Sequence, residues 1–168
     1  MKTISITGPE SSGKTTLAIG LSKLLKENFV KEYARNYLNK KKRYTITDLN
    51  TIAIKQLRKI EEAESKTNNF LITDTSIIDI QIWSEIKYNK CSNKIKAKAN
   101  KEYFDYYLLC KPDFPWIKDS LRENPNKRTE IFIAFINALK KKNANFKILK
   151  GNHLNRLKSA LNFIKKKL

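Results

Sequence analysis

The stretch Gly8-Pro9-Glu10-Ser11-Ser12-Gly13-Lys14-Thr15 (GPESSGKT) decides the fold of this 168-residue chain. It fits the pattern G-x-x-x-x-G-K-[ST], a loop whose backbone N–H groups surround a phosphate. Residues 2–7 alternate apolar and polar side chains as a β-strand does, and leucines at helical spacing follow between residues 17 and 25. A strand before the loop and a helix after it form the context that this motif requires. The sequence therefore predicts a nucleoside triphosphate site.

Each part of the loop has an expected task. Gly8 and Gly13 permit backbone angles that are closed to other residues, so successive N–H groups turn inward. Lys14 reaches the β- and γ-phosphates, and the Thr15 hydroxyl ligates Mg²⁺. The helix N-terminus adds the positive end of its dipole. We expect ATP to be held by these loop residues: Gly8, Glu10, Ser11, Ser12, Gly13, Lys14, Thr15 and Thr16.

Strands and helices alternate along the rest of the chain. Short apolar runs predict strands at 2–7, 28–31, 70–74, 106–110 and 146–149. Helical spacing predicts helices at 14–26, from about Thr47, at 76–88, at 128–142 and after Gly151. This order predicts an α/β fold of the P-loop NTPase kind, with a doubly wound, mostly parallel five-stranded sheet and helices on both faces. We expect one domain over residues 1–168, in which 87–104 form a surface excursion.

The composition limits the classes of partner. The net charge is +19, but 29 of the 35 basic residues are lysine, and asparagine and isoleucine are also abundant. Codons rich in A and T produce this combination, so we do not expect a nucleic-acid partner despite the charge. No apolar run approaches the roughly 20 residues of a membrane helix. Because the first predicted strand begins at residue 2, we expect no signal peptide and a cytoplasmic protein.

Two carboxylates follow predicted strands. Asp74 ends the strand at 70–74, where a phosphate loop needs a second metal-binding group, although an aspartate there also caps a following helix. Glu32 follows the short strand at 28–31 and is placed to take a proton from an acceptor hydroxyl, or is a surface residue at a helix start. Its neighbours Tyr33 and Arg35 offer the acceptor a ring and a cation. Either Glu32 or Asp74 is then the general base.

A proline-rich segment at residues 111–128, here called the lid segment, follows the strand at 106–110. It holds three of the four prolines and ends with Arg122 and Arg128, six residues apart. Kinases of small molecules close such segments over the transferring phosphoryl group, and the planar guanidinium binds phosphate oxygens through two bonds. We expect both arginines to be catalytic. Trp116 either stacks on a planar ligand or packs the segment.

Taken together, these motifs resemble a known family. They are Gly8–Leu17, Glu32–Arg35, Thr73–Thr75 with Trp83 downstream, and Pro112–Trp116 followed by Asp119, Leu121, Arg122 and Arg128. In order and spacing they are similar to the ribosylnicotinamide kinase domain of NadR-type NAD-biosynthesis proteins, over about residues 1–150.

The resemblance implies phosphorylation of nicotinamide riboside to nicotinamide mononucleotide by ATP and Mg²⁺. It implies that Lys14, Thr15 and Asp74 serve ATP and the metal. It also implies an acceptor pocket formed by Glu32, Tyr33, Arg35, Trp83, Asp113 and Trp116. No fused adenylyltransferase domain is found in the 168 residues, so we expect the mononucleotide but not the dinucleotide as product.

Two other functions stay open at this point. One is the same reaction on a different nucleoside or sugar. The other is an ATP-dependent regulatory switch that binds a partner such as nucleic acid, which the net charge of +19 favours slightly. Phosphoryl transfer to a small acceptor would indicate a kinase, whereas hydrolysis stimulated by nucleic acid would indicate the switch.

Overall fold

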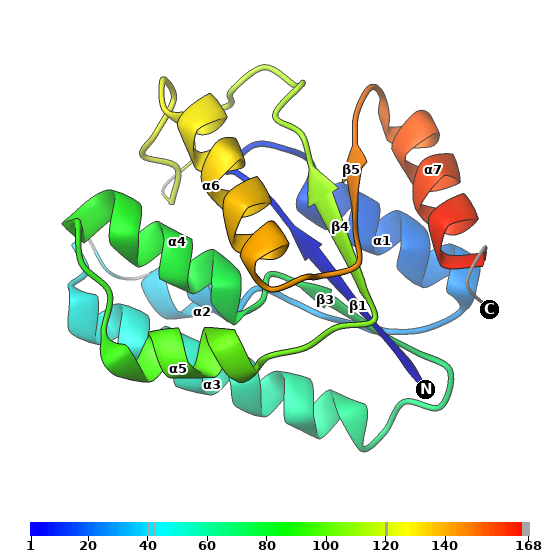
Figure 1. Cartoon of the computed structure of the whole chain (residues 1–168), viewed down its shortest axis with the longest axis horizontal. Coiled ribbons are helices and arrows are strands. Elements are labelled where there is room, and N and C mark those ends of the chain that lie inside the picture. Colours follow the sequence, from blue (N-terminus) through cyan, green and yellow to red (C-terminus); the bar gives the residue numbers. More distant parts are fainter. Residues whose placement is uncertain (40, 42, 120, 166–168) are drawn as a thin grey trace.

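The structure, a computed structural model, describes residues 1–39, 41, 43–119 and 121–165. Its centre is a five-stranded sheet in the order β2-β3-β1-β4-β5, in which every pairing is parallel (Figure 1). The strands are β1 (Lys2–Thr7), β2 (Phe29–Val30), β3 (Phe70–Asp74), β4 (Tyr106–Cys110) and β5 (Phe146–Leu149). Positions 40, 42, 120 and 166–168, which fall in the predicted domain and lid segment, lie outside the described residues.

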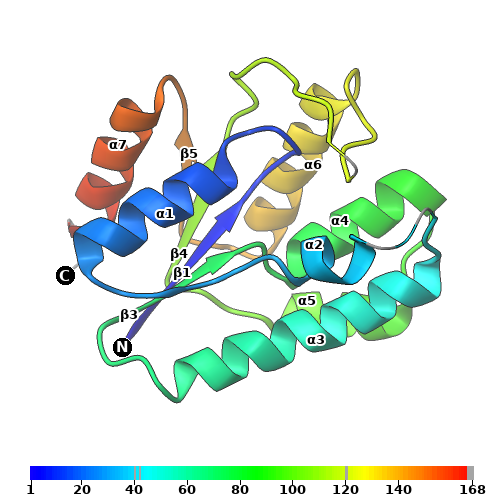
Figure 2. The same cartoon turned by 180° about the vertical axis from the view of Figure 1, so that it is seen from behind.

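Helices cover both faces of the sheet, as predicted. They are α1 (Lys14–Leu25), α2 (Tyr33–Leu38), α3 (Ile46–Glu64), α4 (Ile77–Tyr88), α5 (Asn93–Lys101), α6 (Arg128–Lys141) and α7 (His153–Lys165). Helices α1 and α7 pack on one face, while α4, α6 and part of α3 pack on the other (Figures 1 and 2). The predicted fold class is therefore confirmed.

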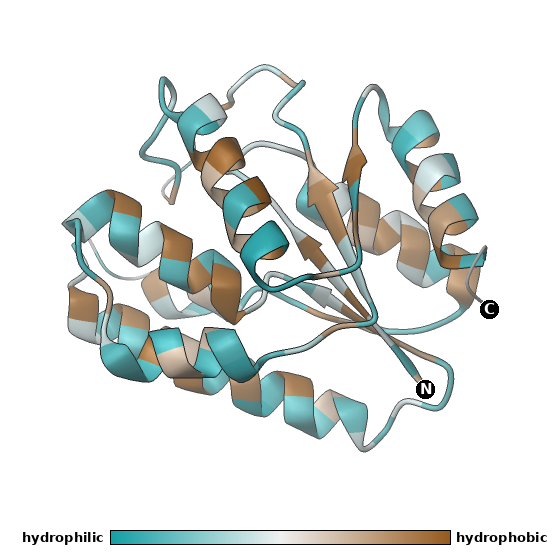
Figure 3. Ribbon diagram, in the orientation of Figure 1, coloured by the Kyte–Doolittle hydropathy of each residue, from teal (hydrophilic) through white to brown (hydrophobic). Residues whose placement is uncertain are grey.

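The alternation of side chains along each strand builds these two layers. In β4, Tyr106 and Leu108 point into the layer with α1 and α7, while Tyr107 and Leu109 point into the layer with α4 and α6. All five residues of β4 are buried, and Figure 3 shows apolar colour on the arrowhead of β4. A strand buried on both faces is continuously apolar, which is the pattern that the sequence shows.

Helix α3 begins at Ile46, one residue from the predicted start near Thr47, but its N-cap is Thr45, which forms a capping box with Asp48. Two other details were not expected from the sequence. The segment 87–104 contains helix α5 instead of being only an excursion. A third group of buried side chains from α2, α3, α4 and α5 forms a separate helical cluster beside the sheet. In the described part of the chain, no helix is both long enough and apolar enough to cross a membrane.

The strand order brings the predicted functional residues to one edge of the sheet. Ile6 of β1 pairs with Asp74 of β3, and Val30 of β2 pairs with Thr73 of β3. The segments that follow β1, β2 and β3 therefore emerge side by side at the carboxyl ends of the strands. Ligands of open α/β sheets bind at this edge.

Candidate active site

The loop after β1 has the backbone shape of a phosphate cradle. Gly8, Ser11 and Gly13 have positive φ angles of 139°, 55° and 82°. A Cβ atom on Gly8 would lie 2.6 Å from the carbonyl oxygen of Cys110, and one on Gly13 would lie 2.9 Å from the ring of Phe114. Both glycines are therefore required by conformation and by space.

The lysine of the loop lies within the cradle. Lys14 Nζ donates to the carbonyl oxygens of Gly8, at 2.7 Å, and Pro9, at 3.0 Å. The Ser12 hydroxyl donates to the same Pro9 carbonyl at 2.7 Å. The cleft next to the loop, here called the phosphate cleft, is lined by residues 10–16, Glu32, Arg35, Leu121 and Arg122.

Asp74 has the surroundings of a metal-binding carboxylate. The Thr15 hydroxyl donates to its Oδ2 at 2.7 Å, while its Oδ1 is buried without a hydrogen-bond partner among the described residues. Burial raises the pKa of Asp74, and Lys14 and the bond from Thr15 oppose that rise. A hydroxyl and a carboxylate are oxygen ligands of the kind that Mg²⁺ prefers, so Thr15 and Asp74 fit the predicted metal.

Glu32 is the residue before α2, and its side chain is 22 % exposed. Arg35 Nε lies 3.2 Å from its Oε2. Burial is the main cause that raises the pKa of Glu32, and the nearby Asp74 and Asp79 add to the rise. Lys14 and Arg35 lower the pKa of Glu32. A carboxyl group with a raised pKa is a better proton acceptor near neutral pH than an ordinary glutamate.

A second hollow adjoins the phosphate cleft and is here called the apolar cavity. It contains about 740 Å³ of space between protein atoms, part of which is open to solvent. Its polar lining residues are Glu10, Lys14, Glu32, Gln56, Thr75, Asp79 and Asn124. Gly8, Pro9 and a larger set of apolar side chains complete the lining: Ala34, Ile52, Ile80, Ile82, Trp83, Ile86, Leu121, Ile131 and Phe135. Four residues line both the cavity and the phosphate cleft: Glu10, Lys14, Glu32 and Leu121.

Of the three aromatic residues expected in the acceptor pocket, one lines the apolar cavity and two lie elsewhere. Trp83 lines the apolar cavity, and its Nε1 donates to the Tyr44 hydroxyl at 2.9 Å. The Tyr33 ring lies against the Tyr37 ring at 5.9 Å, and Tyr33 does not line the cavity in the described structure. Trp116 contacts the phosphate loop, with its Nε1 donating to Glu10 Oε1 at 2.8 Å.

The lid segment lies against the phosphate loop. Arg122 lines the phosphate cleft, and its Nη1 donates to the Ile117 carbonyl at 2.7 Å. Arg128 Nη1 donates to the carbonyl oxygens of Phe114, at 2.8 Å, and Ser11, at 3.4 Å, so it ties the lid segment to the loop. Arg35, which lines the phosphate cleft, also pairs with Asp119 at 3.0 Å. Of the two lid arginines, Arg122 therefore faces the cleft.

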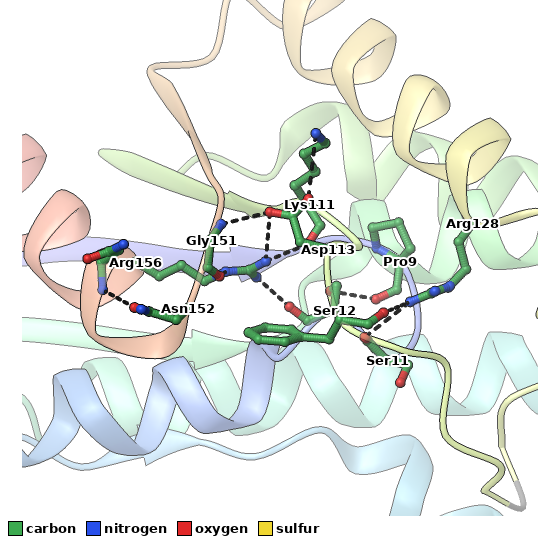
Figure 4. A network of polar contacts seen from close by, with 11 residues as sticks. Pro9, Ser11, Ser12, Lys111, Asp113, Arg128, Gly151, Asn152 and Arg156 are labelled. Carbon is green, nitrogen blue, oxygen red and sulfur yellow. Dashed lines mark hydrogen bonds and ion pairs between the residues drawn. The ribbon is translucent and has the colours of Figure 1, made fainter.

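Asp113 lies outside the apolar cavity, in a polar network around the buried Arg156 of α7 (Figure 4). Arg156 donates to the carbonyls of Gly151 at 2.8 Å, Ser12 at 2.6 Å and Lys111 at 2.8 Å. Its Nη2 also lies 3.4 Å from Asp113 Oδ2. One guanidinium thus joins the phosphate loop, the start of the lid segment and the turn before α7. Asp113, which was expected in the acceptor pocket, therefore belongs to the Arg156 network and not to the pocket.

Sequence-based analysis missed several residues of the cavity. Asp79 accepts from the Thr7 hydroxyl at 2.8 Å and closes a capping box with Ser76, a pattern visible in the sequence as Ser-x-x-Asp. Gln56 accepts from the Tyr33 N–H at 2.8 Å and donates to the Thr75 carbonyl at 3.3 Å. Gln56 could have been found from the sequence, because it is a polar residue in the middle of the apolar face of a predicted helix.

Known proteins resemble this chain in sequence. Two relatives, each named "Trifunctional NAD biosynthesis/regulator protein NadR", come from Salmonella typhimurium and Escherichia coli. Each is 26 % identical to this chain over 127 residues, covering 73 % of this chain and 31 % of the relative. This chain therefore spans about a third of the length of the curated relatives that it matches.

Solved structures share the fold at low sequence identity. A NadR crystal structure in complex with NR superposes with a TM-score of 0.77 at 18 % identity, covering 98 % of this chain and 51 % of that one. Thymidylate kinase from Ehrlichia chaffeensis gives a TM-score of 0.68 at 16 % identity, with 99 % and 98 % covered. A deoxyadenosine kinase from M. mycoides with bound dCTP gives 0.68 at 14 % identity, with 98 % and 99 % covered. These likenesses establish a P-loop kinase fold.

A family model described as "AAA domain" matches residues 3–156, which is most of the chain. That range includes the phosphate loop, Glu32, Asp74, the lid segment and Arg156. The chain therefore belongs to the AAA_28 family of AAA domains.

Proposed function

We propose that this chain transfers the γ-phosphoryl group of ATP, with Mg²⁺, to a hydroxyl group of a small nucleoside, and that this nucleoside is nicotinamide riboside. The observation that carries the proposal is the position of Glu32, which lines both the phosphate cleft and the apolar cavity. A group at this junction is placed to take a proton from an acceptor whose hydroxyl points at the phosphate. The family and the kinase folds of the solved relatives support the reaction class.

The lining of the apolar cavity supports the choice of acceptor. Glu32 and Asp79 bring carboxyl groups to it, and Lys14 is the one basic residue among the described lining residues. Trp83 adds an aromatic ring to the lining, and the face of an indole attracts a cation through its π electrons. Nicotinamide riboside carries a positive pyridinium ring, so its charge suits this lining. The names of the two curated relatives, which concern NAD biosynthesis, point the same way.

Each residue of the site has a separate role in the proposed phosphoryl transfer. The acceptor oxygen bonds to the γ-phosphorus, the bond from that phosphorus to the bridging oxygen breaks, and the hydroxyl proton passes to Glu32. Lys14 and Arg122 neutralise the charge that spreads over the phosphoryl oxygens. Thr15 and Asp74 would hold Mg²⁺, which supplies further neutralisation of the phosphates when bound. The lid segment, which lies against the phosphate loop, would limit the access of water to the cleft during transfer.

The test compares ATP consumption across a panel of acceptors with Mg²⁺ present. The panel contains nicotinamide riboside, other nucleosides, ribose, and DNA or RNA, and the Lys14→Ala variant controls for contaminating activity. We expect rapid turnover with nicotinamide riboside and formation of the mononucleotide. Turnover with another nucleoside would keep the reaction class and refute the acceptor. Stimulation by nucleic acid alone would refute the kinase and favour the regulatory switch.

A further inference from the structure

Glu10 belongs to the phosphate loop by sequence, but its carboxylate contacts the lid segment. Its Oε1 accepts from Trp116 Nε1 at 2.8 Å and from the Asn124 backbone N–H at 2.6 Å. Its Oε2 accepts from the Glu123 backbone N–H at 3.0 Å. Two consecutive N–H groups and an indole thus surround one carboxylate. Hydrogen bonds to an ionised acceptor are about twice as strong as those between neutral groups.

The donors come from both halves of the lid segment. Trp116 lies in the half that leaves β4, while Glu123 and Asn124 lie in the half that returns to α6. The neighbouring Ser11 adds a second attachment, since its hydroxyl donates to the Pro115 carbonyl and accepts from the Ile117 N–H, each at 3.2 Å. Glu10 and Ser11 of the phosphate loop therefore hold the lid segment in place.

This attachment fixes the position of the lid arginine that faces the phosphate cleft. Arg122 immediately precedes Glu123, whose N–H is bound by Glu10. Leu121 and Asn124, on either side, line the apolar cavity. Movement of the chain at Glu123 would therefore displace a wall of the cavity and the guanidinium of the cleft together.

Electrostatics argue against a direct contact between Glu10 and the nucleotide. A carboxylate within the phosphate loop repels a triphosphate, whereas the dipoles of three N–H donors from the lid segment partly offset the field of this carboxylate and so weaken the repulsion. We propose that Glu10 is a latch that holds the lid segment closed over the phosphate loop, and that it is a positioning residue for Arg122. The catalytic part of this inference rests on the proposed function, whereas the latch itself does not.

The experiment compares Glu10→Ala and Glu10→Gln with the native chain. The matched control is Glu130→Ala, which removes an exposed carboxylate from the first turn of α6. Hydrogen exchange of the amides of Glu123 and Asn124 reports the latch. A second readout is the emission of Trp116, measured in a Trp83→Phe background so that one tryptophan remains. Steady-state kinetics and equilibrium ATP binding complete the set, and circular dichroism verifies that each variant folds.

In Glu10→Ala we expect the two amides to exchange about tenfold faster or more, and the Trp116 emission to move to longer wavelength. We expect kcat to fall about tenfold while ATP affinity changes less than about threefold. Glu10→Gln keeps the oxygen that serves Trp116 and Asn124, so it should be intermediate, and the control should match the native chain.

Unchanged exchange and emission in Glu10→Ala would overturn the proposal. A tenfold loss of ATP affinity with an unchanged lid segment would also overturn it, because Glu10 would then be a nucleotide contact. If the native chain phosphorylates no acceptor, the proposed function fails, but exchange and emission still decide whether the latch exists.

Discussion

At the scale of single residues, burial raises the pKa of three carboxyl groups at the site, and two of them, Asp74 and Glu32, are the candidates for the general base. Asp74 accepts a hydrogen bond from the hydroxyl of Thr15 in the phosphate loop and is buried. Glu32 lines both the phosphate cleft and the apolar cavity. The sequence left the general base open between these two residues. From their positions we infer that Asp74 serves the metal and that Glu32 serves the acceptor.

Replacing Glu32 by glutamine tests its role. The amide cannot take a proton, so Glu32→Gln should lower kcat about 100-fold or more while ATP affinity stays nearly constant. Because burial raises the pKa of Glu32, the native activity should fall on acidification at a higher pH than an ordinary glutamate would give. The measurement is kcat/KM as a function of pH, with Glu130→Gln as the matched control. Near-normal turnover in Glu32→Gln would remove this residue from the mechanism.

The metal role of Asp74 is tested by binding rather than by activity. The native chain should bind ATP more tightly with Mg²⁺ present than with a chelator that removes Mg²⁺. In Asp74→Asn the neutral side chain holds the cation less well, so we expect this enhancement to fall about tenfold or more. Titration calorimetry with and without Mg²⁺ measures the difference. An equal enhancement in both proteins would show that Asp74 does not hold the metal.

The loop and Asp74 could be predicted from sequence because their positions follow from local patterns. A strand, a glycine-containing loop and a helix are contiguous, and Asp74 closes an apolar run. The contacts of Glu10 could not be predicted, because its donors lie 106 to 114 residues further along the chain. Tyr33 and Asp113 are residue types that suit an acceptor pocket, but neither lines the cavity in the structure. The direction of a side chain depends on the tertiary fold, so the local sequence did not reveal this.

At the scale of elements, helix predictions succeeded where several apolar residues repeat. Helix α4 was predicted at 76–88 and runs from Ile77 to Tyr88. Helix α5 was missed because it is short and lysine-rich, with Ile95 and Ala99 as its buried residues. Two apolar positions one turn apart are too few to indicate a helix, although Ser92 provides an N-cap for it.

A buried carboxyl group from outside α4 binds the N-terminus of that helix. Glu102, after α5, accepts from the N–H groups of Ile77, at 2.9 Å, and Ile78, at 3.4 Å. Burial raises its pKa from an ordinary 4.5 to about 7, although the backbone hydrogen bonds oppose the rise. The folded chain therefore binds this proton more tightly than the unfolded chain does. Protonation of Glu102 stabilises the fold, and this stabilisation is lost as the pH rises from 4.5 to about 7.

A substitution isolates this effect. The glutamine in Glu102→Gln cannot ionise. As the pH rises from 5 to 8, the free energy of unfolding should therefore decrease less for this variant than for the native chain. We expect the two curves to diverge by about 2 kcal/mol. Urea unfolding at a series of pH values measures both, with Glu130→Gln as the control. Parallel curves would show that the pKa of Glu102 is not raised.

At the scale of the whole molecule, Arg156 connects parts of the fold that are far apart in sequence. It lies in α7, 144 residues from Ser12, and its side chain is fully buried. Its guanidinium also lies 4.4 Å from the ring of Phe114 at the start of the lid segment. The sheet order and the packing of α7 against α1 bring these segments together, so the role of Arg156 emerges only once the topology is known.

Removing this guanidinium should destabilise the whole fold. Arg156→Met leaves three carbonyl groups without their donor in a buried region, which should lower the free energy of unfolding by about 3 kcal/mol. Arg58→Met, on the exposed side of α3, is the matched control and should change stability by less than about 0.5 kcal/mol. Urea unfolding measures both. Equal stabilities for the two variants would contradict the network in Figure 4.

The measurement that tests the central claim most directly is the stoichiometry of a single turnover. The chain is mixed with Mg²⁺, nicotinamide riboside and less than one equivalent of ATP, and both products are quantified by mass spectrometry. Phosphoryl transfer to the nucleoside predicts equal amounts of ADP and nicotinamide mononucleotide, and neither product with Lys14→Ala. ADP that forms without the mononucleotide would contradict the account, because the chain would then hydrolyse ATP without phosphorylating this acceptor.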